Sequence, residues 1–235
     1  MSKNPIPLER QQDWWWYIAK GKLLKFIISK NFEEKHINKI LEIGPGLGNN
    51  IKILSEFGKV DILETEVEFT KYLQENFNNY IDNFYSELKL TDKNYDLIVM
   101  LDVLEHIKDS ELFMKNLEQH LSSNGRIIIG VPAYMKLWSN HDVELKHYRR
   151  YDWNTLEKDC IDYKVVNKYG FNFLLLPIRF FQLKFLKNIH STYETNKAIN
   201  TFFVFVSNIE NLLRSIKINP KFGLSLYALL AKKVN

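Results

Sequence analysis

Residues 40–48 read Ile-Leu-Glu-Ile-Gly-Pro-Gly-Leu-Gly, and this stretch decides the fold. Its apolar start predicts a buried strand, and the glycines at alternate positions predict a tight turn that leads into a helix. Side chains at those glycines would keep a ligand away from the backbone, whereas the helix N-terminus beyond them offers free N–H groups. Glu64 follows a second predicted strand, residues 60–63, where a carboxylate can accept hydrogen bonds from a ribose diol. The pattern indicates a nucleoside-binding half-fold.

The composition is that of one globular domain without a nucleic-acid surface. The 235 residues are 46% hydrophobic, which suits a single core, and 32 basic against 28 acidic residues leave a net charge of +4. The lysines are scattered rather than gathered in a stripe, so no nucleic-acid partner is expected. Cys160 is the single cysteine, which excludes an internal disulfide framework and a cysteine-based zinc site. The N-terminus lacks a signal-peptide apolar region, and no apolar run reaches the roughly 18 residues that span a bilayer.

Short apolar runs alternate with helical periodicity along the middle of the chain, which is the pattern of a parallel sheet with crossover helices. A helix that begins at Asp109 or Ser110 is expected to end at His120, and Gly125 lies in the turn into a strand that Pro132 ends. The predicted strands of this part are residues 39–43, 60–63, 80–84, 95–100 and 126–131.

The pattern changes after the fifth strand. Residues 133–151 form a polar, aromatic segment with turn-like character, residues 155–160 look helical, and residues 163–168 are a candidate sixth strand. An unusually apolar helical stretch at residues 171–218 is broken by a polar run at residues 190–197. A last strand is then predicted before the charged C-terminal residues.

The single domain, residues 1–235, divides into four parts. They are an N-terminal helical cover (1–38), a cofactor-binding core (39–170), a helical insertion (171–222) and the last strand (223–235).

The glycine spacing decides between nucleoside cofactors. A dinucleotide-binding fingerprint has the spacing Gly-x-Gly-x-x-Gly, with the helix N-terminus facing a pyrophosphate. Here the spacing is Gly-x-Gly-x-Gly, Glu42 precedes it within the strand, and no Gly-Lys-Ser/Thr motif is present to hold a triphosphate. The turn therefore disfavours a dinucleotide.

Four segments occur in a characteristic order: residues 40–48, 63–64, 95–107 and 121–131. The third reads Tyr-Asp-Leu-Ile-Val-Met-Leu-Asp-Val-Leu-Glu-His-Ile. Together they resemble the class I S-adenosylmethionine-dependent methyltransferases, over residues 39–132. The resemblance implies an α/β, Rossmann-like fold with a seven-stranded, mostly parallel sheet and an antiparallel last strand, which residues 223–230 fit. It also implies S-adenosylmethionine as cofactor and S-adenosylhomocysteine as product.

The resemblance assigns cofactor contacts position by position. Glu42 and the glycine turn would shape the methionine end of the site, with Gly48 opening the helix. Glu64, with Thr65 beside it, would hold the ribose hydroxyls, and Asp102 at the tip of the fourth strand would flank the cofactor. The assigned contacts in this core are Glu42, Gly44, Gly46, Gly48, Glu64, Thr65, Tyr85, Leu101 and Asp102.

Three of these positions leave alternatives open. Glu42 could be a carboxylate that braces the turn, and Asp102 could be a helix cap. The adenine contact has no clean match, because Tyr85 lies with Asn83 and Ser86 where the family often places an acidic or polar group.

The N-terminal segment, residues 13–20, reads Asp-Trp-Trp-Trp-Tyr-Ile-Ala-Lys. It resembles the Trp-Trp-Phe-x-x-Arg opening of a bacterial subset of these enzymes, with Lys20 at the arginine position. The resemblance implies an aromatic helix over the cofactor and a Lys20 that pairs with the cofactor's carboxylate, without the bidentate fork of arginine. The alternative is an amphipathic helix whose tryptophans are core residues and whose lysine is solvated.

Methyl transfer to a hydroxyl or amine needs a group that takes the acceptor's proton, and histidine suits this near neutral pH. His106 follows the fourth strand, at the edge where an open parallel sheet binds ligands. Residues 140–151 read Asn-His-Asp-Val-Glu-Leu-Lys-His-Tyr-Arg-Arg-Tyr and resemble the His-Asp…His-Tyr-Arg-Arg-Tyr segment of the same subset, whose members commonly sit among enzymes of cell-surface glycans and lipid-linked sugars. We predict His141 as the base with Asp142 as its orienter, and His147 as the next candidate.

The same segment supplies the predicted substrate contacts, Tyr148, Arg149 and Arg150. The planar fork of arginine binds carboxylate or phosphate in bidentate fashion, which suits an anionic or hydroxyl-rich acceptor. The alternative is that the two arginines anchor the loop. No metal is expected, because a His/His/Asp set lacks firm spacing on a helix or strand.

Two apolar runs, residues 173–186 and 201–206, lie between the sixth and last strands, where methyltransferases of this type often carry the acceptor-binding cover. A pair of core-packing helices is the favoured interpretation. The alternatives are a lip that rests on a membrane or admits a lipid tail, since basic residues interleave the aromatics, and a homodimer contact.

The sequence thus predicts a methyltransferase that uses S-adenosylmethionine and acts, at oxygen, on a small molecule or a surface-glycan precursor such as a lipid-linked glycan. One rival is methylation of RNA or protein, of which the weak net charge disfavours RNA. Another is a cofactor-binding partner protein without catalysis. We expect a cytoplasmic protein, with peripheral contact at the inner membrane as the alternative.

Overall fold

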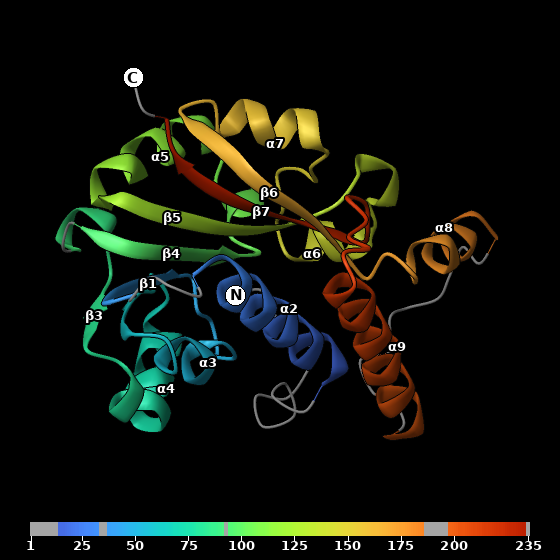
Figure 1. Ribbon diagram of the computed structural model, residues 1–235, viewed down its shortest axis with the longest axis horizontal. Coiled ribbons are helices and arrows are strands. Elements are labelled where there is room, and N and C mark those ends of the chain that lie inside the picture. Colours follow the sequence, from blue (N-terminus) through green and yellow to red (C-terminus); the bar gives the residue numbers. More distant parts are fainter. Residues whose placement is uncertain (1–13, 33–36, 92–93, 186–196, 234–235) are drawn as a thin grey trace.

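The computed structural model describes residues 14–32, 37–91, 94–185 and 197–233. Within them a seven-stranded sheet has the order β3-β2-β1-β4-β5-β7-β6 (Figure 1). Neighbours from β3 to β5 pair in parallel, and β7 runs antiparallel to both β5 and β6. The strands are β1 (Lys39–Ile43), β2 (Lys59–Leu63), β3 (Asn83–Tyr85), β4 (Tyr95–Leu101), β5 (Leu121–Pro132), β6 (Tyr163–Phe171) and β7 (Ser225–Lys232). The predicted α/β, Rossmann-like sheet with an antiparallel last strand is confirmed.

Helices cover both faces of this sheet. Figure 1 shows α5 and α7 on one side and α2, α3, α4 and α9 on the other. The helices are α2 (Trp15–Asn31), α3 (Ile51–Ser55), α4 (Val67–Phe77), α5 (Ser110–Leu117), α6 (Asn140–Glu144), α7 (Trp153–Asp159), α8 (Leu176–Phe185) and α9 (Lys197–Ser215).

The core consists of two apolar clusters, one on each face of the sheet. Successive residues of a strand point to opposite faces, so Ile40 belongs to one cluster and Leu41 to the other, as do Leu97 and Ile98 of β4. Both sides of these strands are buried, which explains why their sequences are mostly apolar. Helix α2 fills the first cluster with four fully buried side chains: Leu23, Leu24, Ile27 and Ile28.

Helix α9 packs on α2 and on the end of β6. Trp15 of α2 stacks on Phe203 of α9 with ring centroids 4.6 Å apart. The buried Glu210 accepts hydrogen bonds from the backbone N–H groups of Asn172 and Leu174 and pairs with Arg214 at 3.0 Å. The inner face of α9 is therefore part of the core, as the favoured interpretation of the insertion expects.

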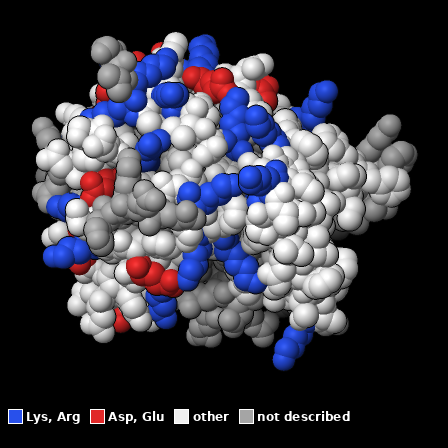
Figure 2. All heavy atoms as spheres, in the orientation of Figure 1, with Lys and Arg blue, Asp and Glu red and all other residues white. Residues whose placement is uncertain are grey.

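The outer face of α9 is exposed and almost uncharged. Glu210 and Arg214 are buried, while Phe202, Phe205 and Leu212 are exposed. Figure 2 shows this part of the surface largely without Lys, Arg, Asp or Glu. Contact of the insertion with a membrane or a second copy stays a prediction. Among the described residues, no helix is long and apolar enough to cross a membrane.

Several element boundaries differ from the predicted ones. Residues Asn78–Tyr80 extend α4 by a 3-10 turn, so the third strand begins at Asn83, whose side-chain amide donates to Asp61 of β2 at 2.8 Å. The fifth strand begins at Leu121, five residues before its predicted start, and the last strand begins two residues later than predicted. Apart from Lys197, where α9 begins, the predicted polar break lies outside the described residues. The division into cover, core, insertion and last strand stays a prediction.

Candidate active site

The glycine turn adopts a backbone that favours glycine. Gly46 and Gly48 have φ angles of +54° and +74°, in the left-handed region. A Cβ atom at Gly48 would lie 2.8 Å from Leu73, so this position is closed by packing against α4. A Cβ atom at Gly46 would meet nothing within 4 Å. The space over Gly46 is therefore open to a ligand that approaches the backbone.

Glu64 lies against this open part of the turn. Its buried carboxylate accepts hydrogen bonds from the N–H groups of Gly46 at 3.1 Å and of Glu66 at 3.0 Å. Burial raises the pKa of Glu64, and these two hydrogen bonds oppose the shift. The exposed Thr65 follows it, and the backbone carbonyl of Tyr85 accepts the N–H of Glu64 at 2.9 Å. The structure thus brings together four predicted cofactor residues, whose roles stay predictions.

Glu42 is buried below the turn. One carboxylate oxygen accepts a hydrogen bond from the Asn50 side chain at 2.9 Å, a contact that supports the turn-bracing alternative. The other oxygen, Oε2, is buried and has no hydrogen-bond partner among the described residues. Burial raises the pKa of Glu42 to about 7. The side chain therefore both braces the turn and leaves one acceptor atom for a ligand.

Asp102 connects the tip of β4 to helix α2. The backbone N–H of Asp102 donates to Gly130 at 2.8 Å, and its carboxylate pairs with Lys20. Burial alone lowers the pKa of Lys20, but the Asp102 carboxylate raises it overall. Lys20 is 5% exposed, so the alternative of a solvated lysine is wrong. Asp102 is not a helix cap either, because the following 3-10 turn has Val103 as its N-cap residue and no side-chain cap bond.

The loop after β5 is organised around the buried Asp142. Its carboxylate accepts hydrogen bonds from His147 Nδ1 at 3.0 Å, from Arg150 Nε at 2.6 Å and from the Ser139 N–H at 2.8 Å. Burial alone raises the pKa of Asp142, yet the bonds from His147 and Arg150 lower it far below the usual range. Asp142 thus orients His147, whereas the sequence paired it with His141, whose pKa burial lowers.

His147 meets the residues that follow β4. Its ring lies edge-to-face against His106, with ring centroids 4.6 Å apart. Burial lowers the pKa of His106, and its ring hydrogen-bonds to the Leu145 backbone. The buried Glu105 is beside them, and burial raises the pKa of Glu105 well above its usual range, with Asp102 adding to the shift. Two histidines predicted from separate segments are therefore neighbours next to Asp102.

A comparison with known proteins identifies the family. Residues 10–168 match a protein family described as a methyltransferase domain, which is more than half of the chain. The chain belongs to the methyltransferase-domain family.

One relative of this methyltransferase-domain protein is the ubiquinone biosynthesis O-methyltransferase of Rickettsia canadensis. The two are 33% identical over 123 residues, which make up 48% of this chain and 52% of the relative. The chain thus spans about half the length of the curated relatives that it matches.

Solved structures agree on the fold. An S-adenosylmethionine-dependent methyltransferase from Clostridium acetobutylicum superposes with a TM-score of 0.57 at 14% identity, over 93% of this chain and 92% of that one. The plantazolicin methyltransferase BpumL, solved in complex with S-adenosylhomocysteine, gives a TM-score of 0.60 at 14% identity, over 96% and 87% of the two chains. The chain therefore has a methyltransferase domain by family, and it shares the fold of these two solved methyltransferases.

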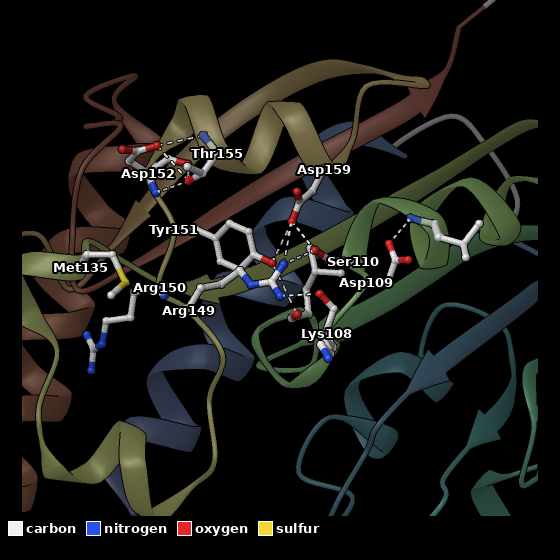
Figure 3. Close-up of polar contacts among 12 residues, drawn as sticks. Lys108, Asp109, Ser110, Met135, Arg149, Arg150, Tyr151, Asp152, Thr155 and Asp159 are labelled. Carbon is white, nitrogen blue, oxygen red and sulfur yellow. Dashed lines mark hydrogen bonds and ion pairs between the residues drawn. The ribbon is translucent and has the colours of Figure 1, made fainter.

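In this methyltransferase-domain protein the two adjacent arginines bond to protein groups. Figure 3 shows the Arg149 guanidinium among Ser110, the Lys108 carbonyl and Asp159, with distances of 2.5, 2.6 and 3.7 Å. Arg150 holds Asp142 through two nitrogen atoms. These contacts favour the anchoring alternative for both arginines.

Tyr148 and Leu101 were also predicted as site residues. The Tyr148 side chain is exposed, while its backbone N–H donates to the Glu105 carbonyl at 2.8 Å. Leu101 is buried at the end of β4. Glu105 was not predicted, because a glutamate after a strand is usually solvated. Glu105 could have been predicted from its position between Asp102 and His106, directly after the strand.

Proposed function

We propose that this chain transfers the methyl group of S-adenosylmethionine to a hydroxyl oxygen of a small molecule. The family supports methyl transfer, and similarity to the Rickettsia ubiquinone biosynthesis O-methyltransferase supports oxygen as the methylated atom. The observation that carries the proposal is the hydrogen bond between Asp142 and His147, which holds an imidazole in one orientation at the ligand-binding edge of the sheet.

The residues around the glycine turn fit this cofactor. The open space over Gly46 admits a ligand to the backbone, and Glu64 beside it would hold the ribose hydroxyls. The unpartnered Oε2 atom of Glu42 would accept a hydrogen bond from the ammonium group of the methionine part. When bound, S-adenosylmethionine supplies a methyl group on a positively charged sulfur atom. Lys20 would add positive charge near the cofactor's carboxylate.

His147 would take the proton of the acceptor. Its Nδ1–H donates to Asp142, so in the neutral ring Nε2 carries the lone pair. In the in-line displacement the S–CH3 bond breaks, the O–CH3 bond forms and the hydroxyl proton passes to Nε2. Asp142, kept charged by Arg150, stabilises the imidazolium that results.

The surroundings of the loop favour a neutral hydroxyl acceptor over an anionic one. Arg149 and Arg150, which were predicted to bind a carboxylate or phosphate, hold Ser110 and Asp142 instead. The argument for a lipid-linked or surface-glycan acceptor then rests on the resemblance of residues 140–151 alone. Phenols and polyols are the acceptor class that we propose.

Turnover with a panel of acceptors tests this function. The purified chain is incubated with S-adenosylmethionine and phenols, polyols or sugar nucleotides, and S-adenosylhomocysteine and the methylated product are measured by mass spectrometry. His147→Gln should lower turnover about 100-fold or more, with the affinity for S-adenosylhomocysteine within about twofold of the parent. His141→Gln is the comparison and should lose less.

Two results would count against the proposal. Full turnover by His147→Gln would show that His147 is not the base. Binding of S-adenosylhomocysteine without methylation of any acceptor would support the rival of a non-catalytic cofactor-binding protein.

A further inference from the structure

Three side chains of metal-ligating type meet at the carboxyl edge of the sheet, beside the predicted cofactor site. Glu105 and His106 belong to the 3-10 turn Leu104–His106 after β4, and His147 lies just beyond α6. Each offers one ligand atom, and these atoms lie within 4.8 Å of one another. The fold thus joins residues that are 41 positions apart in the sequence (106 to 147).

Glu105 has an unusual environment for a carboxylate. The side chain is 0% exposed, and apart from a hydrogen bond with its own backbone N–H the carboxylate has no hydrogen-bond partner among the described residues. A buried carboxylate with so few donors is destabilising unless a proton or a cation neutralises it. Either a proton on Glu105 or a neighbouring cation must therefore supply the missing positive charge.

The two imidazoles provide no obvious donor. His147 uses Nδ1–H on Asp142, and the His106 ring donates to the Leu145 carbonyl. In each neutral ring the second nitrogen is then an acceptor with a lone pair. One nitrogen of each ring and one carboxylate oxygen lie within 4.8 Å of one another. A single proton can satisfy only one pair of these atoms, whereas a cation can satisfy all three side chains together.

From this geometry we propose that Glu105, His106 and His147 bind a divalent transition-metal ion. Two imidazoles and one carboxylate suit Zn²⁺, Co²⁺, Mn²⁺ or Fe²⁺ better than Ca²⁺ or Mg²⁺. The Asp142–His147 hydrogen bond supplies the outer partner that metal-bound histidines have.

The geometry requires a small adjustment. Bonds of about 2.0–2.2 Å to a tetrahedral ion place donor atoms roughly 3.4 Å apart, so the three side chains would close by about 1 Å. His106 is exposed, which gives it room to move and gives an ion a route of entry.

A three-ligand site leaves a position open. If the proposed O-methyl transfer holds, the acceptor hydroxyl fills that position and coordination makes its proton more acidic. With the ion bound, His147 is a ligand rather than the base, and the proton passes to solvent. This last step rests on the proposed function; the ion site itself does not.

Cobalt titration tests the site without cofactor or acceptor. The full chain is treated with chelator, dialysed and titrated with Co²⁺, and visible absorption and elemental analysis give geometry and stoichiometry. We expect one Co²⁺ per chain, with bands of four- or five-coordinate nitrogen and oxygen ligation, and displacement by Zn²⁺.

Variants locate the ion. Glu105→Gln, His106→Gln and His147→Gln should each weaken binding by roughly 10–100-fold, whereas His141→Gln, outside the trio, should bind as the parent does. Circular dichroism shows whether each variant is folded. If Glu105→Gln does not fold, the loss of ion affinity in His106→Gln, at an exposed position, tests the site. Affinity weaker than about 1 mM, or equal affinity in all variants, would overturn the site. Since turnover plays no part in this experiment, its failure is separate from failure of the proposed function.

Discussion

At the scale of single residues, Gly46 and Gly48 of the turn differ in what an added side chain would contact. Gly46→Ala places a methyl group in open space, so its cost in stability is the strain of a positive φ, about 1–2 kcal/mol. The same methyl group should lower the affinity for S-adenosylhomocysteine at least about tenfold, because it stands where a ligand approaches the backbone. Gly48→Ala adds a clash with Leu73 and should lose more stability. Calorimetric titration and urea unfolding measure both effects, and unchanged affinity in Gly46→Ala would contradict the assignment.

Glu42 makes stability depend on pH. Its pKa is about 7 in the folded chain against a usual value of 4.5. Below pH 4.5 the side chain is protonated in both states. Between pH 4.5 and 7 the unfolded chain releases a proton that the folded chain keeps, so stability falls as pH rises; above pH 7 the loss is constant, on the order of 3 kcal/mol.

Glu42→Gln removes this pH dependence. The free energy of unfolding of the variant, relative to the parent, should increase by up to about 3 kcal/mol from pH 4.5 to pH 8. Urea unfolding of the ligand-free proteins at several pH values gives the difference. A difference that stays constant with pH would show that Glu42 ionises normally.

Glu64 is predicted to bind the ribose hydroxyls of the cofactor, and its replacement tests this role. Glu64→Ala should weaken S-adenosylhomocysteine binding by one or two charge-assisted hydrogen bonds, each about 1.5–3 kcal/mol. Glu68→Ala, an exposed carboxylate in the first turn of α4, is the matched control and should bind normally. Equal affinities in titration calorimetry would remove Glu64 from the site.

At the scale of elements, α2 is part of the core rather than a loose cover. Leu24→Ala should destabilise the chain by about 2–5 kcal/mol, because the side chain is fully buried between α2 and the sheet. Lys22→Ala, on the exposed face of the same helix, should change stability by less than about 0.5 kcal/mol. Chemical denaturation compares them, and a small loss for Leu24→Ala would mean that α2 packs loosely.

The elements were predictable where local pattern decides structure. Strands β1, β2 and β4 are mostly apolar runs between turn signals, so the sequence shows them directly. The third strand was misplaced because a 3-10 turn at Asn78–Tyr80 and the bond from Asn83 to Asp61 set its start, and neither leaves a local signal.

Site contacts depend on distant partners, and this limited their prediction. Lys20 was assigned to a ligand, and its ion pair with Asp102, which is 82 residues away, left no local signal. Asp142 was given to its neighbour His141, but Lys146 adopts a positive φ of 57° in the turn that brings His147 onto the carboxylate. The Arg149 contact with Ser110 spans 39 residues. Sequence therefore indicated residues that the fold brings together but not how these residues pair.

At the scale of the whole molecule, the proposed site draws on parts of the chain that are far apart in the sequence. Helix α2 contributes Lys20 to this site, the glycine turn contributes Gly46, and the loop after β5 contributes His147. A ligand that binds between these parts stabilises the folded state as a unit, because the unfolded chain has no site.

Thermal unfolding should report this coupling. At about 100 times its Kd, S-adenosylhomocysteine should add about 2.7 kcal/mol to stability, which raises Tm by roughly 5–10 °C in a chain of this size. NAD⁺ at the same concentration should give no shift, since the Gly-x-Gly-x-Gly spacing disfavours a dinucleotide. Leu24→Ala should start from a lower Tm yet keep the full shift, whereas Glu64→Ala, which also loses its bonds to Gly46 and Glu66, should lose most of the shift whatever its own starting Tm. A full shift in Glu64→Ala would show that the ligand binds elsewhere. If the site includes this carboxylate, Glu64→Ala must lose the shift in Tm while Leu24→Ala keeps it.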